Sequence, residues 1–344
     1  MIYYLWIYYL LFTILTAKVQ KNVLTAKKMC LNLPIYYFFL IFASKILIYQ
    51  KTKTMRLSGR RESSNVEDRR GMSTGAKVGV GGLGGILIAA LFAWMSGGDP
   101  MQAVVQGVQE QMSQRTETVG EQEFTEEEQE LAKLSSQILA GTEDVWTKVF
   151  QDMGRTYTSP TLVLFSNQVQ SACGSATAAV GPFYCSGDQK LYVDLSFFTQ
   201  MKRQLGVEGG DFAYAYVIAH EIGHHVEYLL GTLNEAHQAM SRTDKVSANQ
   251  ISVRLELLAD YYAGVWAHYD NEMFGSMEYG DLEKGLELAK AIGDDWLQKK
   301  AQGRATPESF THGTSDQRKR WLKRGYETGD MRTTTFSVQN YNDL

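Results

Sequence analysis

The feature that most constrains this chain is the run His-Glu-Ile-Gly-His at residues 220–224. Residues four apart lie on one face of a helix, so two histidines at this spacing can bind one metal ion. The preceding residues, 214–219, are apolar or aromatic, which indicates a largely buried helix over residues 212–230. Two histidines and a glutamate facing a core without a metal would be costly. The run therefore predicts a metal site on a buried helix.

The expected ion is zinc, one per chain, with His220 and His224 as two of its ligands. Zinc binds imidazole nitrogen at about 2.0–2.1 Å, and a catalytic site keeps one position for water. Glu221 follows the first ligand. Its carboxylate can accept a proton from the attacking water and later pass that proton to the leaving amine.

A second helical segment, residues 249–269, supplies the third ligand. Glu256 and Asp260 are four apart with apolar neighbours, so both lie on one helix face. We predict Glu256 as the zinc ligand. Asp260 would accept a hydrogen bond from the far nitrogen of a ligand histidine and fix its tautomer. The alternative is a pair of exposed acids on an amphipathic helix.

His312 lies in a loop followed by a basic helix over residues 318–324. Such a histidine can donate a hydrogen bond to the oxyanion of a tetrahedral intermediate, although a purely structural bond is an equal alternative. Arg318 and Tyr216 are weaker candidates for the same task. The histidines that we do not expect to be ligands are His225, His237 and His268.

The pattern of the remaining segments predicts an α+β fold with more helix than strand over residues 125–330. Helices are expected at 131–139, 145–153, 212–230, 249–269 and 282–300, and strands at 161–165 and 191–195. Lys190–Leu195 is the last strand-like segment before the metal helix. By analogy with other zinc peptidases, we expect it to be an edge strand that pairs with substrate.

The chain has three cysteines, Cys30, Cys173 and Cys185, too few for a disulfide framework or a cysteine zinc site. Cys173 and Cys185 flank a turn-rich segment and can form one disulfide in an oxidising compartment. Two buried thiols are an equal alternative. The net charge of −4 and the pI of about 5.9 argue against a nucleic-acid partner.

The N-terminal part has several distinct segments. Residues 1–54 are rich in Ile, Tyr, Leu, Phe and Lys, and we expect translation to start at Met55, although two extra hydrophobic segments are the alternative. Residues 55–77 are basic, and the uncharged residues 78–98 are long enough for a transmembrane helix. The positive-inside rule then places the N-terminus in the cytoplasm. Residues 99–124 would be a linker and 331–344 a tail.

Several stretches resemble the bacterial family of neutral zinc metallopeptidases, from about residue 56 to about 330. They lie at residues 65–71, 181–185, 216–225, 254–260 and 311–315. The resemblance implies a zincin-like domain behind one N-terminal membrane helix. It also implies His220, His224 and Glu256 as zinc ligands and Glu221 as the catalytic residue, and it supports a start at Met55. It supplies no physiological substrate.

The leading hypothesis is a zinc metallopeptidase that hydrolyses peptide bonds in a peptide or protein substrate. It would lie in the bacterial inner membrane with a single span and the catalytic domain on the outer side. A non-catalytic zinc protein, such as an envelope assembly or chaperone-like factor, is the second hypothesis. A binding module for the cell wall or membrane is the third. The presence of Glu221 favours catalysis, because a structural zinc site needs no base.

Overall fold

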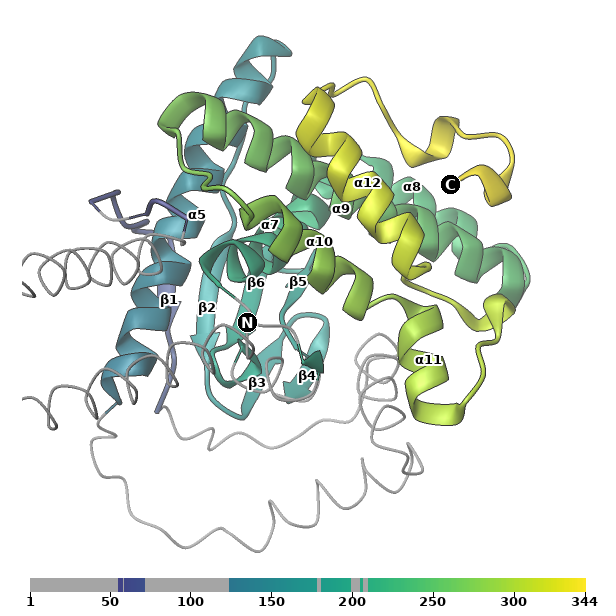
Figure 1. Cartoon of the computed structure of the whole chain (residues 1–344), viewed down its shortest axis with the longest axis horizontal. Coiled ribbons are helices and arrows are strands. Elements are labelled where there is room, and N and C mark those ends of the chain that lie inside the picture. The colour runs from purple at the N-terminus through teal and green to yellow at the C-terminus, as the bar shows by residue number, and fades with distance from the viewer. Residues whose placement is uncertain (1–54, 58, 72–123, 178–180, 199–204, 207–209) are drawn as a thin grey trace, which may run out of the picture. The chain divides into compact units, whose positions relative to one another are not determined.

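A computed structural model describes residues 55–57, 59–71, 124–177, 181–198, 205–206 and 210–344 (Figure 1). Over these residues the fold is α+β and rich in helix, as predicted. The helices are α5 (Glu126–Asp152), α7 (Asp211–Leu230), α8 (Thr232–Met240), α9 (Lys245–Phe274), α10 (Asp281–Ala291), α11 (Asp294–Gln302) and α12 (Ser315–Thr328). The strands are β1 (Val66–Asp68), β2 (Thr161–Phe165), β3 (Gln168–Ser171), β4 (Gly174–Thr177), β5 (Phe183–Cys185) and β6 (Lys190–Asp194).

Predicted helical segments are joined in one place and divided in another. The segments 131–139 and 145–153 form one helix, α5, which begins at a capping box between Thr125 and Glu128. The segment 282–300 is instead divided into α10 and α11 around Gly293. A Cβ at Gly293 would lie 2.3 Å from the backbone nitrogen of Ser315, so this bend lets α12 start against it.

The helices that carry the metal motifs approach one another closely because glycines lie at the contacts. A Cβ at Gly223, inside the His-Glu-Ile-Gly-His run, would lie 2.8 Å from the carbonyl oxygen of Ala259 on α9. A Cβ at Gly264 would lie 2.2 Å from the backbone of Leu322 on α12. These approaches place α9 against α7 on one side and against α12 on another.

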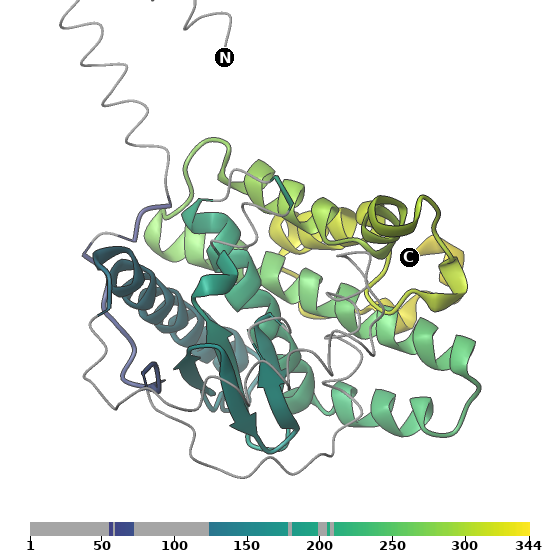
Figure 2. The same ribbon diagram turned by 90° about the horizontal axis from the view of Figure 1, so that it is seen from below.

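The main sheet has the strand order β1-β2-β6-β5, with β1, β2 and β6 parallel and β5 antiparallel to β6. Its strands alternate between two cores. Leu162 and Leu191 face the large core, which includes residues of α5, α7 and α9, while Val163 and Tyr192 face a smaller core with β3 and β4. The sheet and its hairpin thus lie at one side of this domain and helices α9–α12 at the other (Figure 2).

The prediction that residues 190–195 form an edge strand is wrong. Lys190–Asp194 lies between β2 and β5, so both of its edges are already paired. The strand at that end of the sheet is β5, which contacts α7. Length and hydrophobicity marked β6 as a strand, but a parallel partner as distant in sequence as β2 leaves no local signal of pairing.

Cys173 and Cys185 are joined by a disulfide, with their Cα atoms 5.8 Å apart. The first cysteine lies in the turn of the β3–β4 hairpin and the second ends β5. This bond therefore fastens the hairpin to the edge strand.

Residues 55–57 and 59–71 belong to the same folded unit as the helices, which differs from the expected separate basic segment. Strand β1 pairs with β2 in register Val66 to Leu162, and Met55 is buried in the core. The arginines of this segment bind carboxylates of the domain. Arg60 makes a bidentate contact with Asp270 at 2.6 and 3.0 Å, and the others form the pairs Arg56–Glu278, Arg61–Glu143, Arg61–Asp144, Arg69–Glu67 and Arg70–Asp68.

These ion pairs change the argument about membrane topology. The arginine cluster indicated a cytoplasmic flank, but the fold accounts for it through internal pairing. Strand β1 pairs with β2, so these arginines belong to the same sheet as residues 161–165. The expected span, residues 78–98, lies outside the described residues. None of the helices described is both long and apolar enough to cross a membrane.

The C-terminal residues 331–344, expected as a tail, also pack on the domain. Thr335 donates a hydrogen bond from Oγ1 to the carbonyl of Arg254 on α9 at 2.7 Å. The last residue, Leu344, is fully buried in the large core.

Candidate metal centre

The centre is built on α7, whose apolar residues bury it in the large core. The helix ends at Gly231, which adopts a left-handed conformation with φ of 90°. His220 and His224 lie one turn apart on the same face, with ring centroids 4.9 Å apart. The sequence prediction of one helix face carrying both histidines is therefore met by the structure.

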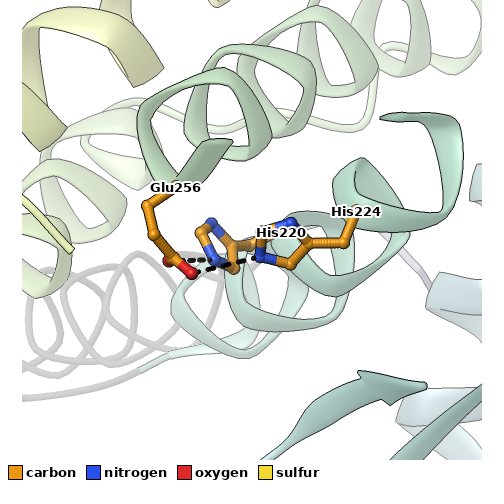
Figure 3. A group of neighbouring side chains, drawn as sticks. All are labelled: His220, His224 and Glu256. Atoms are coloured by element: carbon orange, nitrogen blue, oxygen red, sulfur yellow. Dashed lines mark ion pairs between the residues drawn. The ribbon is translucent and has the colours of Figure 1, made fainter. Parts of the chain in front are cut away.

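Helix α9 supplies the third group. It begins at Asp244, whose side chain accepts hydrogen bonds from the backbone of Val246 and Ser247. Glu256 reaches across to α7, so its Oε2 lies 3.2 Å from Nε2 of His220 and its Oε1 lies 3.5 Å from Nε2 of His224 (Figure 3). One ligand atom from each of the three residues lies within 4.8 Å of the others.

This donor set fits zinc. Ligand atoms at about 2.0–2.1 Å from a tetrahedral zinc ion lie roughly 3.3 Å from one another, close to the separations around Glu256. Two imidazoles and one carboxylate match the ligand types of catalytic zinc sites. Of the described residues, His220, His224 and Glu256 form the one such cluster of metal-binding groups.

His220 is anchored from behind by Asp260, as predicted from the spacing on α9. Nδ1 of His220 lies 2.9 Å from Oδ1 of Asp260, and a proton held on Nδ1 by this carboxylate leaves Nε2, which faces Glu256, as the nitrogen that can bind a metal in place of a proton. Asp260 is fully buried and also accepts bonds from Tyr216 at 2.6 Å and from Nε of Arg318 at 2.8 Å. Tyr216 and Arg318, weaker candidates for oxyanion contact, instead hold Asp260.

His224 has its own anchor, Glu227, which the sequence reasoning missed. Nδ1 of His224 donates to Oε2 of Glu227 at 2.9 Å, and Glu227 is fully buried. Both residues lie on α7 at a spacing of three, so a helix-face argument from His224 would have found this pair.

The protonation of these groups is strongly coupled. Burial lowers the pKa of His220, but the charge and hydrogen bond of Asp260 outweigh it and raise that pKa to about 9. Burial also lowers the pKa of His224, but the charges of Glu227 and Glu256 outweigh it. They hold the pKa of His224 well above its ordinary value. Burial is also outweighed at Glu256, where the charges of His312 and His224 hold the pKa well below its usual range. A zinc ion therefore competes with protons for these side chains.

Glu221 lies beside the ligands and next to the edge strand β5. Burial raises the pKa of Glu221, whereas the charges of His220 and His224 and a hydrogen bond from the backbone of Tyr184 lower it, with a net increase. A carboxylate with a raised pKa is better matched to accepting a proton near neutral pH.

His312 reaches the same centre from the loop before α12. It is close enough to Glu256 for each to shift the pKa of the other. Nδ1 of His312 lies 3.2 Å from Oδ1 of Asp294, whose Oδ2 accepts backbone hydrogen bonds from residues 311–313. Asp294, the first residue of α11, fixes this loop and was not singled out from sequence, because its partner is distant along the chain.

The side chain of His225 makes its hydrogen bonds to β5 and to the loop before β2. Its Nδ1 accepts a hydrogen bond from the Tyr184 hydroxyl at 2.9 Å, and its Nε2 donates to the carbonyl of Thr158 at 2.7 Å. Burial lowers the pKa of His225 to about 4, against the opposing effect of the Thr158 bond. His225 therefore stays neutral and ties α7 to β5. His268 likewise makes a backbone contact, with Tyr326, away from the metal cluster.

Fold and site together define an α+β protein with two histidines and a glutamate poised for one metal ion and a further glutamate beside them. The chain belongs to the family described as "Putative neutral zinc metallopeptidase", which matches residues 55–336. This confirms the resemblance inferred from the motifs, and the match runs from Met55 in the N-terminal segment to Phe336, beyond the end of α12.

Two relatives illustrate the similarity. The uncharacterized protein YpfJ of Escherichia coli K12 is 46% identical over 285 residues, covering 80% of this chain and 96% of that protein. The uncharacterized protein Mb2605 of Mycobacterium bovis is 44% identical over 183 residues, covering 51% of this chain and 61% of that protein. No solved structure matches this chain.

Proposed function

We propose that this protein is a zincin-like, zinc-dependent metallopeptidase that hydrolyses peptide bonds. The observation that carries the proposal is the position of Glu221 directly after the ligand His220, within a His-His-Glu cluster whose donor separations suit zinc. When bound, zinc would lower the pKa of water and polarise the scissile carbonyl. A site with only a structural task would have no use for Glu221.

The side chains of the site would supply the remaining catalytic and positioning roles. Glu221 accepts the proton of the attacking water and returns it to the leaving amine. His312, held by Asp294, donates a hydrogen bond to the oxygen that becomes negative. Asp260 and Glu227 keep the Nε2 atoms of the two histidines facing the ligand position.

For substrate binding we propose the edge strand β5 in place of β6. The Tyr184 backbone already contacts Glu221, which puts this edge next to the reacting groups. An extended peptide can add to a free sheet edge through main-chain hydrogen bonds.

We also propose that the domain lies outside the cytoplasm. The Cys173–Cys185 disulfide supports this location, because such bonds persist in oxidising compartments. Because β1 pairs with β2, we also propose that residues 55–71 lie on the same side of the membrane as the metal centre. Attachment to the inner membrane through residues 78–98 stays a prediction.

The test is cleavage of a fluorogenic peptide library by the full-length protein and its Glu221→Gln variant, each loaded with zinc. We expect the variant to hold zinc and to lose about 10²–10⁴-fold in rate. Zinc binding by both proteins with no cleavage by either would instead favour the non-catalytic zinc protein.

A further inference from the structure

Each of the two ligand histidines is hydrogen-bonded to a buried carboxylate, and the surroundings of these two carboxylates differ. Asp260, behind His220, also contacts the guanidinium of Arg318 at 2.8 and 3.0 Å and the hydroxyl of Tyr216. Its negative charge is therefore balanced by the fold itself. Glu227, behind His224, has no arginine or lysine partner among the described residues, and its one ion-pair partner there is His224 itself.

Among the residues that the structure describes, the one hydrogen-bond partner of Glu227 is Nδ1 of His224. Within the part of the chain that the structure describes, its other oxygen, Oε1, is buried and has no hydrogen-bond partner. A buried carboxylate without balancing charge is costly. Through its hydrogen bond, Glu227 contacts His224. The positive charge available to Glu227 is therefore that of His224 and of the ion that His224 would bind.

We propose that Glu227 is a positioning residue that couples its buried charge to the metal ion through His224, and so raises the affinity of the site for zinc. This rests on the proposed zinc site. Glu227 holds the proton of His224 on Nδ1, which leaves Nε2 free, and it makes that nitrogen a stronger donor. Asp260 orients His220 in the same way, but its main electrostatic partner is Arg318. Glu227 therefore contributes mainly to zinc affinity, and Asp260 contributes mainly to the stability of the fold.

The experiment compares zinc affinity with stability in the full-length protein. Zinc alone is the probe, titrated in competition with a chromophoric chelator, and the melting temperature is measured in excess chelator. Glu227→Gln keeps a hydrogen-bond acceptor and loses the charge, whereas Glu227→Leu loses both. Asp260→Asn is the matched control, because it removes the charge of the anchor that has a cation.

We expect zinc affinity to fall roughly 10-fold in Glu227→Gln and roughly 100-fold in Glu227→Leu. The melting temperature in chelator should not fall in Glu227→Gln, and it should fall in Asp260→Asn because Arg318 is left unpaired. A zinc affinity of Glu227→Leu within about threefold of wild type would overturn the inference, as would a loss of melting temperature in Glu227→Gln equal to that in Asp260→Asn. A wild-type protein that binds no zinc would overturn the proposed function instead.

Discussion

Nδ1 of His220 lies 2.9 Å from Oδ1 of Asp260, on the side of the imidazole ring away from Glu256. The two residues come from different helices, and Gly223 allows those helices to approach until this bond can form. The bond fixes the tautomer of His220, and Arg318 in turn fixes Asp260. A buried ion pair thus lies directly behind the candidate metal ligand.

Replacement of Arg318 tests that pair. Arg318→Met would leave the carboxylate of Asp260 buried without its cation, so the free energy of unfolding should fall by about 3–5 kcal/mol. Urea denaturation measures the change. Arg332→Met is the control, because the Arg332 side chain is 91% exposed, so solvent screens its pair with Asp330 and no measurable change is expected. A change below about 1 kcal/mol for Arg318→Met would show that this pair does not support the fold.

Replacement of His312 tests its assigned contact with substrate. If His312 stabilises the oxyanion, His312→Ala should lower kcat by about 10²–10³-fold, the usual effect of removing one such donor. Zinc content should be unchanged, because His312 is not among the cluster of metal-binding groups. Steady-state cleavage and elemental analysis of the same preparation provide both values. An unchanged kcat would leave His312 with only its structural bond to Asp294.

The neutral His225 predicts a pH-dependent stability. Its pKa of about 4 in the folded protein lies below its ordinary value of 6.5, so the unfolded chain binds a proton first as the pH falls. Stability is therefore retained above about pH 6.5 and lost between pH 6.5 and pH 4, by about 3 kcal/mol in full, at roughly 1.4 kcal/mol per unit.

The measurement for His225 is the free energy of unfolding from pH 7.5 to pH 4.5, in chelator, for wild type and His225→Gln. Other groups titrate in both proteins, so the difference between the two curves isolates His225. The difference should change by up to about 3 kcal/mol across this range. Parallel curves would mean that His225 titrates normally in the folded protein.

The pairing of β1 with β2 predicts that the two ends of the domain share one compartment. Ser64 and Gln339 are both exposed, so single cysteines at these positions can be probed in intact cells with a membrane-impermeant maleimide. In a background with Cys30→Ser, Ser64→Cys and Gln339→Cys should both react or both be protected. Reaction at one position alone would mean that β1 and the helices are separated by the membrane.

The sequence predicted the local parts of the site well, and the long-range parts less so. The helix spacing of His220, His224, Glu256 and Asp260 follows from one period, which is why their helix faces could be assigned without a partner. The contacts of Asp294 with the His312 loop and of Arg60 with Asp270 join distant segments, and nothing in their neighbours indicates them.

The sequence signal for membrane topology is ambiguous for a similar reason. The arginines of residues 56–70 carry the same signal whether they flank a bilayer or pair with buried acids. Only the tertiary partners, among them Asp270 and Glu143, distinguish the two cases.

The most direct test of the account is the zinc content of the purified full-length protein and three variants, measured by elemental analysis. Wild type and Glu221→Gln should each hold about one zinc per chain, and Glu256→Ala should hold almost none. Glu272→Ala, which removes an exposed acid of the same helix, should match wild type. Full zinc content in Glu256→Ala, or none in wild type, would contradict the His220, His224 and Glu256 assignment.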